Sequence, residues 1–267
     1  MFSEVLPDCW HQQLKFRPRI LAFHKVINQF SFGSTNYSPQ RLEHLLTALQ
    51  CKGFIFQSLE MVLSNNNPMG VAVTFDDGYH HLIDILPLLM EKYHLKPTVF
   101  LPTKYMGKAN SWDYSYLFRP TPHLDVKSVA TLAALGVEFG SHGHSHVNLC
   151  RCDGETLRHE LEHSKTVLED VLGTRIDCIS YPFGRYNQKV LKAAFEAGYT
   201  SGFSMRFPES DDMALAIGRF GIYGYDSVAS VMRKLTGGPL YGVEKWKARI
   251  TNRLSGGTAI YNRLIRN

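Results

Sequence analysis

This sequence lacks the features that mark a membrane-spanning, secreted or nucleic-acid-binding protein. It has no run of about 18 or more apolar residues, so no membrane-spanning helix is predicted. Residues 1–19 carry charged side chains and no apolar core segment, so no secretory signal peptide is predicted. The net charge of +5 falls far short of the dense basic stripe of a nucleic-acid-binding protein.

Cysteine is also scarce. The five cysteines are odd in number and scattered, at Cys9, Cys51, Cys150, Cys152 and Cys178. This pattern favours reduced thiols in a cytoplasmic protein over a disulfide framework. The hydrophobic fraction of 44% and the charged fraction of 20% are ordinary for a soluble globular protein. A chain of 267 residues forms either one barrel-like α/β domain or two small domains.

Stretches with strand character alternate with stretches of helical periodicity about seven times along the chain. Strands are expected near residues 20–26, 54–56, 71–75, 97–101, 137–140, 177–181, 199–203 and 216–223, and helices near 38–53, 80–93, 126–135, 155–172 and 187–197. This alternation predicts a mostly parallel sheet that closes, or nearly closes, into a barrel. No internal repeat or linker divides the chain, so a single domain is predicted. It comprises an N-terminal extension (1–19), the barrel (20–238) and a basic helical tail (239–267).

The most informative stretch is the apolar run over residues 71–75, which stops abruptly at Asp76, Asp77 and Gly78. A buried strand is predicted to deliver the two carboxylates to its carboxyl end, where α/β folds place their chemistry. Two adjacent carboxylates repel each other unless they share a cation or a proton. The pair therefore predicts a cation close by.

Three histidines within five residues, His142, His144 and His146, follow another predicted strand and are candidate ligands for that cation. Two imidazoles and one carboxylate, with an open position for water, make up the ligand set of a hydrolytic zinc site. His142 and His146 are four residues apart, so a helical turn or a tight loop aims both at one ion, whereas His144 points elsewhere if the segment is helical. Two alternatives stay open: a polar loop without ligands, and a rival site that recruits Cys150 and Cys152.

Three motifs together resemble a known family. Residues 74–78 (Thr-Phe-Asp-Asp-Gly) and His142-x-x-x-His146 resemble the first two motifs of the polysaccharide deacetylases (carbohydrate esterase family 4, the NodB homology domain). Residues 180–184 (Ser-Tyr-Pro-Phe-Gly) resemble the third motif. The resemblance extends over about residues 20–223 and implies a distorted (β/α)7 barrel, in agreement with the number of alternating elements.

The resemblance also implies the roles of the site residues. Asp77, His142 and His146 would hold a divalent metal, with Zn²⁺ the expected ion, and Asp76 would be the general base. A divalent cation lowers the pKa of water and polarises an acetamide carbonyl. Asp76 cannot also be a ligand if it is to accept the proton of the water, which explains why a second carboxylate is needed.

Three further residues are predicted to contact the substrate or the oxyanion. The family stabilises the oxyanion with a backbone N–H at the position that matches Phe183, and Tyr181 belongs to the same motif. Trp112 lies in a long loop, and long loops in compact domains tend to bind ligands. Its ring is predicted to stack on a sugar, and the alternative is a plain hydrophobic plug.

The proton of the leaving amine requires a separate donor. The family usually takes it from a histidine near the C-terminal end of the domain, but no histidine follows His163 here. One branch, similar to the enzymes that deacetylate poly-N-acetylglucosamine, is circularly permuted and carries this histidine on the first strand. Residues 22–26 (Ala-Phe-His-Lys-Val) resemble that strand, so His24 is predicted to be the general acid. A satisfied core histidine is the alternative.

The third motif departs from the common form, in which an arginine orients the catalytic aspartate. Ser180 stands in place of that arginine. Arg219 on a late predicted strand, or Arg185 just past the motif, could supply the charge instead. Arg219 is preferred because a strand holds a guanidinium more firmly than a turn does.

The tail beyond residue 239 is rich in lysine and arginine, with Glu244 as the opposing charge. The favoured interpretation is a helix that packs against the barrel through the apolar residues Trp246, Ile250, Leu254, Tyr261 and Leu264. The alternative is a peripheral contact with an anionic membrane surface.

These observations predict a metal-dependent hydrolase that removes N-acetyl groups from a glycan or glycoconjugate containing N-acetylhexosamine. The predicted location is cytoplasmic, with the inner membrane face as a variant. A hydrolase of a non-sugar amide or cyclic imide, and a non-catalytic glycan-binding barrel, are the alternative functions.

Overall fold

The computed structural model describes residues 12–28, 35–109 and 121–254. Within these residues eight strands form one parallel sheet, in which the order β10-β1-β5-β6-β7-β8-β9 is extended by β4 pairing with β5. A separate parallel pair joins β2 to β3. The strands are β1 (Ile20–Phe23), β2 (Lys25–Val26), β3 (Asn36–Tyr37), β4 (Ile55–Phe56), β5 (Gly70–Phe75), β6 (Thr98–Leu101), β7 (Glu138–Ser141), β8 (Cys178–Ser180), β9 (Ser201–Phe203) and β10 (Phe220–Gly221).

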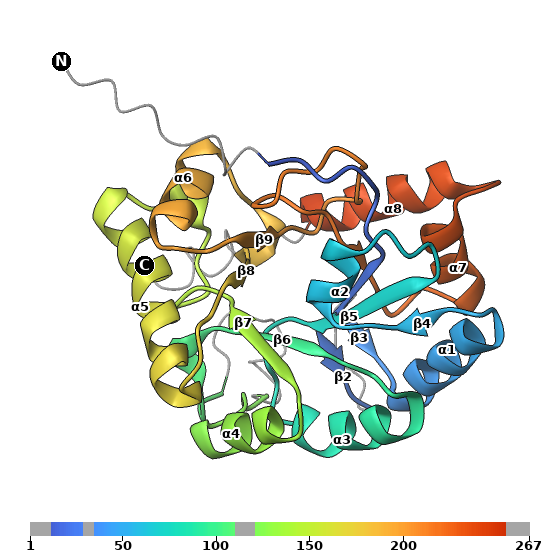
Figure 1. Cartoon of the computed structure of the whole chain (residues 1–267), viewed down its shortest axis with the longest axis horizontal. Helices are drawn as coiled ribbons and strands as arrows, with labels where there is room; N and C mark the ends of the chain where they lie inside the picture. Colours follow the sequence, from blue (N-terminus) through green and yellow to red (C-terminus); the bar gives the residue numbers. More distant parts are fainter. Residues whose placement is uncertain (1–11, 29–34, 110–120, 255–267) are drawn as a thin grey trace.

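Helices surround the strands, with α5 and α6 on one side of the molecule and α1 and α7 on the other (Figure 1). Several of these helices begin at capping residues that the sequence displays. Ser38 accepts a hydrogen bond from the backbone N–H of Arg41, and Asp153 accepts one from Thr156. The helices are α1 (Pro39–Cys51), α2 (Leu59–Ser64), α3 (Leu82–Tyr93), α4 (Val126–Ala134), α5 (Gly154–Leu172), α6 (Gln188–Glu196), α7 (Val228–Thr236) and α8 (Tyr241–Leu254), with short 3-10 turns at Thr103–Tyr105, Leu149–Arg151 and Pro182–Gly184.

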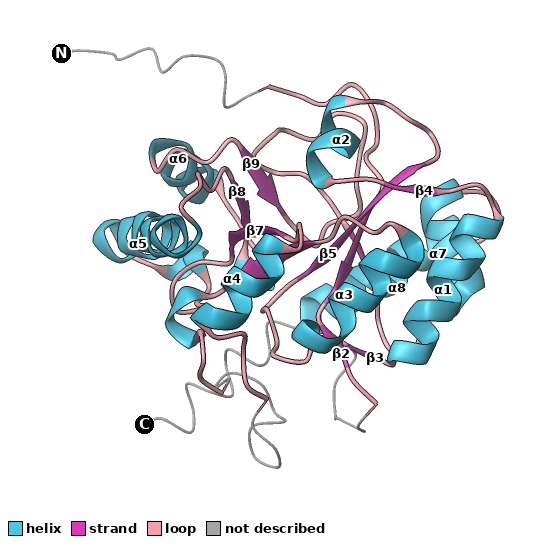
Figure 2. Ribbon diagram, turned by 60° about the horizontal axis from the view of Figure 1, so that its bottom comes forward, coloured by secondary structure: helices cyan, strands magenta, loops and turns pink. Residues whose placement is uncertain are grey.

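The two ends of the sheet curl toward each other. An isolated parallel bridge pairs Phe203 of β9 with Ile217, which lies three residues before β10. The Ile217 N–H donates to the carbonyl of Gly202, and the Ser204 N–H donates to the carbonyl of Ile217, both at 2.8 Å. The strands and the helices around them therefore form the distorted (β/α)7 barrel that the sequence predicted, seen from a second direction in Figure 2.

The core is built around β5. All six of its residues are buried, and it pairs with β1 and β6 as well as β4. A strand buried on both faces reads as a continuous apolar run, which explains the composition of residues 70–75. The ring of Phe75 at its end stacks on Phe23 at the end of β1, with 5.6 Å between the ring centroids. The carboxyl ends of β5 and β1 are thereby held side by side.

Two details differ from the sequence-based expectation. Arg219 lies just before β10 and not on a strand. On α8, the side chains of Trp246 and Ile250 are 62% and 38% exposed, so the prediction that these two pack against the barrel is wrong. The side chain of Leu254 and the residues Tyr261 and Leu264 lie outside the described part of the chain. The helix is anchored instead by the buried Ala248 and by Glu244, whose carboxylate bonds Ser230 and Arg233 of α7. In the described ranges, no helix has the length and apolar character needed to cross a bilayer.

Candidate metal centre and catalytic residues

The candidate site lies at the carboxyl ends of neighbouring strands. Asp76 and Asp77 follow β5, His24 follows β1, His142 follows β7, and Ser180 is the last residue of β8. Because parallel strands end at the same edge of a sheet, residues that are more than 100 positions apart in the sequence meet there. The order β1-β5-β6-β7-β8 places all of them along one continuous arc of the barrel.

Asp76 forms a bidentate ion pair with Arg219. Nη1 and Nη2 of Arg219 donate to Oδ1 and Oδ2 of Asp76, at 2.8 Å and 2.7 Å. The hydroxyl of Ser180 donates to Oδ2 at 3.2 Å and accepts a bond of 2.7 Å from Arg219 Nη2. Ser180 therefore occupies the place of the missing motif-three arginine in the sequence, and Arg219 supplies the guanidinium from the segment just before β10.

The guanidinium of Arg219 is completely buried. Its Nη1 also donates to the hydroxyl of Thr74 at 3.0 Å, and its carbon Cζ lies 5.2 Å and 5.9 Å from the ring centroids of Phe100 and Phe203. Such a dry, aromatic setting strengthens both the ion pair and the cation–π contacts. The orientation of Asp76 is thus fixed by an arginine that cannot itself rotate.

Burial is the largest single influence and would raise the pKa of Asp76, but the charge and hydrogen bonds of Arg219, together with the nearby His142 and His24, outweigh it and lower this pKa to about 2. Asp76 is therefore ionised at neutral pH although it is only 1% exposed. In the described part of the chain, Oδ1 accepts a hydrogen bond from Arg219 alone. A carboxylate oxygen has a further lone pair, so Oδ1 keeps the capacity to accept a proton.

Asp77, His142 and His146 form the second half of the site. Oδ1 of Asp77 lies 3.6 Å from Nε2 of His142 and 3.2 Å from Nε2 of His146. All three side chains are buried, and their ligand atoms all lie within 4.8 Å of one another. The structure therefore brings together the three residues that the sequence singled out as metal ligands.

The surroundings of this triad fit a cation. Oδ1 of Asp77 is buried and accepts no hydrogen bond from the described residues, which is costly for a carboxylate unless a cation faces it. Nδ1 of His142 donates to the carbonyl of Ser180 at 2.6 Å, which aims Nε2 at Asp77. Burial lowers the pKa of His142 to about 4, so this imidazole is neutral, as a metal ligand must be.

Unusual backbone conformations occur at the site. Asp77, His146 and Phe183 all have left-handed φ values, 68°, 54° and 60°. Such residues cost on the order of 1–3 kcal/mol each and persist where the surrounding structure enforces them. Gly78 also has a positive φ, and a Cβ there would lie 1.9 Å from Leu101. The glycine of the first motif is therefore required by both conformation and space.

His24 lies at the rim of the site. Its Nε2 is 4.0 Å from Oδ2 of Asp76, and its side chain is 19% exposed, compared with 2% for Asp76. In the described part of the chain, Nδ1 of His24 is buried without a hydrogen-bond partner. The structure thus places His24 next to the Asp76 carboxylate, with its side chain partly exposed to solvent.

The three residues predicted to contact the substrate or the oxyanion lie in different surroundings. The side chain of Tyr181 is completely buried and donates to the carbonyl of Leu215 at 2.8 Å, so a direct contact of this side chain with substrate is excluded. The ring of Phe183 packs on His146 with 4.8 Å between centroids. Trp112 lies outside the described residues.

The remaining candidates do not join the site. The four described cysteines, Cys51, Cys150, Cys152 and Cys178, are free thiols. Neither Cys150 nor Cys152 belongs to a potential metal-binding group among the described residues. Arg185 makes no hydrogen bond or ion pair with Asp76. Of the two arginines considered for orienting Asp76, Arg219 is the one that contacts it.

Two buried residues support the site without having been predicted. Oε2 of Glu160 on α5 accepts hydrogen bonds from the backbone N–H groups of His144 and Ser145, at 2.9 Å and 2.8 Å, and Oε1 accepts one from the Ser145 hydroxyl. Nδ1 of His123 donates to the carbonyl of Asp77 at 2.7 Å. Glu160 therefore holds the loop that carries His142 and His146, and His123 holds the backbone at Asp77. No local sequence pattern marks either residue.

Fold and site together define an α/β barrel protein with a candidate metal centre at the carboxyl ends of its strands, next to a second carboxylate that is paired with an arginine. The chain belongs to the polysaccharide deacetylase family, whose family model matches residues 64–202. A Bacillus subtilis (strain 168) protein, YxkH, whose name places it with the same family, is 32% identical over 133 residues. That match covers 49% of this chain and 43% of YxkH, so the chain spans less than half the length of this relative.

Solved structures share the fold. A Streptococcus pyogenes deacetylase, PplD, in complex with acetate superposes with a TM-score of 0.70 at 22% identity, covering 83% of this chain and 99% of PplD. IcaB from Ammonifex degensii gives 0.67 at 15% identity, covering 84% and 98%. A de-N-acetylase from Aggregatibacter actinomycetemcomitans gives 0.69 at 14% identity, covering 82% and 99%. At these low sequence identities, the structural similarity establishes the fold alone.

Replacing Arg219 is expected to destabilise the protein strongly. Arg219→Ala leaves the Asp76 carboxylate buried and unpaired, which costs about 3–5 kcal/mol of the free energy of unfolding. Arg185→Ala, the matched control on the turn, is expected to change it by less than about 0.5 kcal/mol. Urea denaturation followed by circular dichroism measures both. Equal effects of the two substitutions would contradict the assignment of the ion pair to Arg219.

Replacing Glu160 is expected to weaken metal binding without removing a ligand. Glu160→Gln loses the charge-assisted hydrogen bonds to the loop, and loss of such outer-shell support typically lowers metal affinity by about 10–100-fold. Glu162→Gln, on the exposed side of the same helix, is the control and is expected to leave the affinity unchanged. Competition with a chromophoric chelator measures the dissociation constant for Zn²⁺, and an unaltered constant in Glu160→Gln would refute the role.

Proposed function

We propose that this protein is a metal-dependent hydrolase that removes N-acetyl groups from an amino-sugar-containing glycan or glycoconjugate. The observation that carries the proposal is the contrast between two adjacent carboxylates. Asp76 is surrounded by hydrogen-bond donors, whereas Oδ1 of Asp77 faces two imidazole nitrogens and accepts no hydrogen bond from the described residues. One carboxylate is thus suited to hold a cation and the other to move a proton.

Asp77, His142 and His146 are the residues that would hold the metal. A buried set of two imidazoles and one carboxylate matches the three protein ligands of a catalytic zinc site, so Zn²⁺ is the ion proposed. When bound, a divalent cation polarises an acyl oxygen and lowers the pKa of water at the site.

Asp76 is proposed as the general base. The attacking water adds its oxygen to the acetamide carbon and gives a proton to Oδ1 of Asp76. Arg219 keeps the carboxylate ionised and fixed, so that the oxygen is already oriented when the water arrives. Arg219 acts through Asp76 and is therefore a positioning residue.

His24 is proposed as the general acid. As the C–N bond breaks, the amine nitrogen takes a proton from the imidazole and leaves, and the acyl part departs as acetate. The position of His24 near Asp76, on the more exposed side of the site, supports this role. The backbone N–H of Phe183, in a turn held by a left-handed φ of 60°, is proposed to stabilise the oxyanion before the bond breaks.

The substrate proposed is a saccharide that bears N-acetylhexosamine. Family membership supports it, as do the names of fold neighbours that are a deacetylase in complex with acetate and a de-N-acetylase. The chain's own geometry adds that Nε2 of His24 lies 4.0 Å from Oδ2 of Asp76, so that base and acid can serve a single amide group in turn.

An acetate-release assay tests the proposal. With zinc added, the wild-type protein is expected to release acetate from N-acetylglucosamine oligomers, and Asp76→Asn is expected to lower the rate by about 10²–10⁴-fold because it removes the proton acceptor. Asp84→Asn, an exposed carboxylate on α3, is the matched control and should leave the rate unchanged.

The zinc content of Asp76→Asn is expected to equal that of the wild type, because Asp76 is not a ligand, whereas Asp77→Asn should lose the ion that Asp77, His142 and His146 would hold. If the wild-type protein binds zinc and releases no acetate from any glycan, the proposed function is wrong, and hydrolysis of a non-sugar amide or simple glycan binding becomes the better description.

We further propose a peripheral contact between α8 and an anionic membrane surface. The exposed side chains of Val243, Trp246 and Ile250 recur at helical spacing on one face of α8, with the exposed Arg249 and Arg253 among them. An amphipathic face that combines a tryptophan with arginines is typical of helices that lie in the membrane interface. This face is free of the contacts through Ala248 and Glu244 that anchor the helix.

Vesicle flotation checks this contact. The full chain is expected to float with vesicles that contain an anionic phospholipid, and Trp246→Ala/Ile250→Ala should reduce the floating fraction because it removes the buried apolar area. Leu88→Ala, which removes a 65% exposed leucine from α3, is the control. A wild-type chain that stays at the bottom of the gradient would eliminate the contact.

A further inference from the structure

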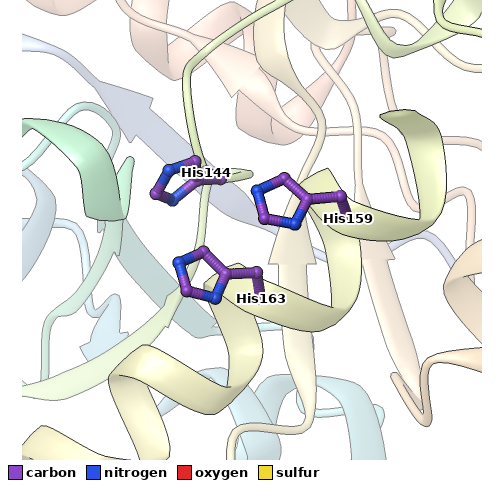
Figure 3. Close-up of side chains that lie close together, drawn as sticks. All are labelled: His144, His159 and His163. Atoms are coloured by element: carbon purple, nitrogen blue, oxygen red, sulfur yellow. The ribbon is translucent and has the colours of Figure 1, made fainter. Parts of the chain in front are cut away.

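A second group of histidines lies next to the candidate metal centre and has no place in the proposed reaction. It consists of His144, from the loop between His142 and His146, and of His159 and His163 from α5. Figure 3 shows the three imidazoles directed toward one another, two from consecutive turns of the helix and one from the loop. We name this group the histidine cluster.

The three rings are close enough to share one ion. Their centroids are 4.6 Å apart for His144 and His163, 4.8 Å for His159 and His163, and 5.4 Å for His144 and His159. One nitrogen from each ring lies within 4.8 Å of the others. Imidazole nitrogens on a tetrahedral zinc ion, each about 2.05 Å from it, are about 3.3 Å apart. Small side-chain rotations would bring the nitrogens from this separation to the shorter one. His159 and His163 are exposed, so their side chains have room to rotate.

The helical spacing explains why the cluster forms. His159 and His163 are four residues apart on α5, so their side chains lie one above the other on the same face. Their rings are almost parallel, with 12° between the planes. Two imidazoles arranged in this way already provide half of a tetrahedral ligand set, and the loop contributes a third.

His144 is held ready for such a role. Its Nδ1 lies 2.9 Å from the hydroxyl of Thr103, and its backbone N–H donates to Glu160 of α5. In the tautomer in which Nδ1 donates to Thr103, the other nitrogen, Nε2, carries the lone pair that a metal requires. A hydrogen bond to the non-ligating nitrogen is the usual outer-shell partner of a metal-bound histidine.

The charges near the cluster are mixed. The Glu160 carboxylate accepts a hydrogen bond from the backbone N–H of His144, and the positive charge of Lys104 also lies near this imidazole. A neutral imidazole is the form that binds a metal. The carboxylate of Glu160 supplies negative charge next to a set of three neutral ligands, which favours a divalent cation over an anion.

We propose that the histidine cluster is a second metal site, which takes a divalent transition-metal ion of the zinc, copper, nickel or cobalt class. Three imidazoles without a carboxylate suit these ions and disfavour magnesium and calcium, which prefer oxygen ligands. Water fills the fourth position, because two of the ligands are exposed to solvent. The ion joins the loop of residues 142–146 to α5 and so clamps the two ligands of the first site from outside.

A zinc titration of the metal-free full-length chain tests the second site. Isothermal titration is expected to give two ions per chain for the wild type and one for His159→Ala/His163→Ala. His44→Ala, an exposed histidine on α1, is the matched control for His159→Ala and should keep both ions. Because His159 and His163 are exposed, their replacement should leave the circular dichroism spectrum unchanged.

The titration separates the two sites. One ion in both the wild type and His159→Ala/His163→Ala would overturn the histidine cluster and leave the first site intact. One ion in the wild type and none in His159→Ala/His163→Ala would confirm the cluster and overturn the metal site of the proposed function. Metal binding at the histidine cluster is therefore tested independently of deacetylase activity.

A spectroscopic measurement assigns the ligands directly. In His142→Ala/His146→Ala, which lacks the first site, cobalt(II) is expected to bind at the cluster and to show the visible absorption of a tetrahedral ion with nitrogen ligands. Adding His159→Ala to that variant should abolish the absorption. An unchanged cobalt spectrum after this substitution would overturn the proposal, and so would the absence of any cobalt absorption when circular dichroism shows that the parent variant is folded.

The clamp has a separate readout. Saturating zinc is expected to slow amide hydrogen exchange in residues 142–147 of the wild type beyond the protection seen in zinc-loaded His159→Ala/His163→Ala. Equal protection in the two proteins would show that the cluster does not hold the loop.

Discussion

The ion pair between Asp76 and Arg219 is the interaction on which the rest of the site depends. Burying two charges is expensive, and the expense is offset only when the geometry is good and the remaining hydrogen-bonding groups are satisfied. Here both carboxylate oxygens are bonded, and Thr74 and Ser180 take up further hydrogen bonds of the guanidinium. The pair connects the end of β5 with the segment before β10, which are separated by β1, and so braces the interior of the barrel.

The ion pair with Arg219 explains how two consecutive aspartates acquire different partners. Asp76 continues the line of β5 and is drawn to Arg219, whereas the left-handed backbone of Asp77 turns its side chain toward His142 and His146. The pKa of both carboxyl groups lies below its usual value, so the two aspartates differ in the partners of their carboxylates and not in their charge at neutral pH. The next residue, Gly78, also has a positive φ and has no Cβ to collide with Leu101, so the chain can turn away from the site there.

The sequence predicted those parts of the molecule that are encoded locally. The apolar run before Asp76, the helix expected from residue 38 onward and the spacing of His142 and His146 each lie within a short stretch. The structure has a buried strand at the first, a helix at the second and two neighbouring imidazoles at the third. The role of Glu160 was not predicted, because nothing in the sequence around a single glutamate on an amphipathic helix indicates which distant loop it will contact. The exposure of Trp246 was not predicted either. Helical spacing defines an apolar face of a helix, but it does not show whether another part of the protein covers that face.

The histidine-bearing loop also shows why local pattern and local structure diverge. Spacing alone allowed a helical turn to align His142 with His146, but the segment is a loop in which Gly143 and His146 have positive φ values. These two bends send His142 and His146 into the barrel and leave His144 facing α5. The inner side of α5 then fixes the loop through Glu160, and its outer side presents the other members of the histidine cluster. One helix, α5, thus contacts the loop that carries His142 and His146 in two ways, through the hydrogen bonds of Glu160 and through the rings of His159 and His163 next to His144.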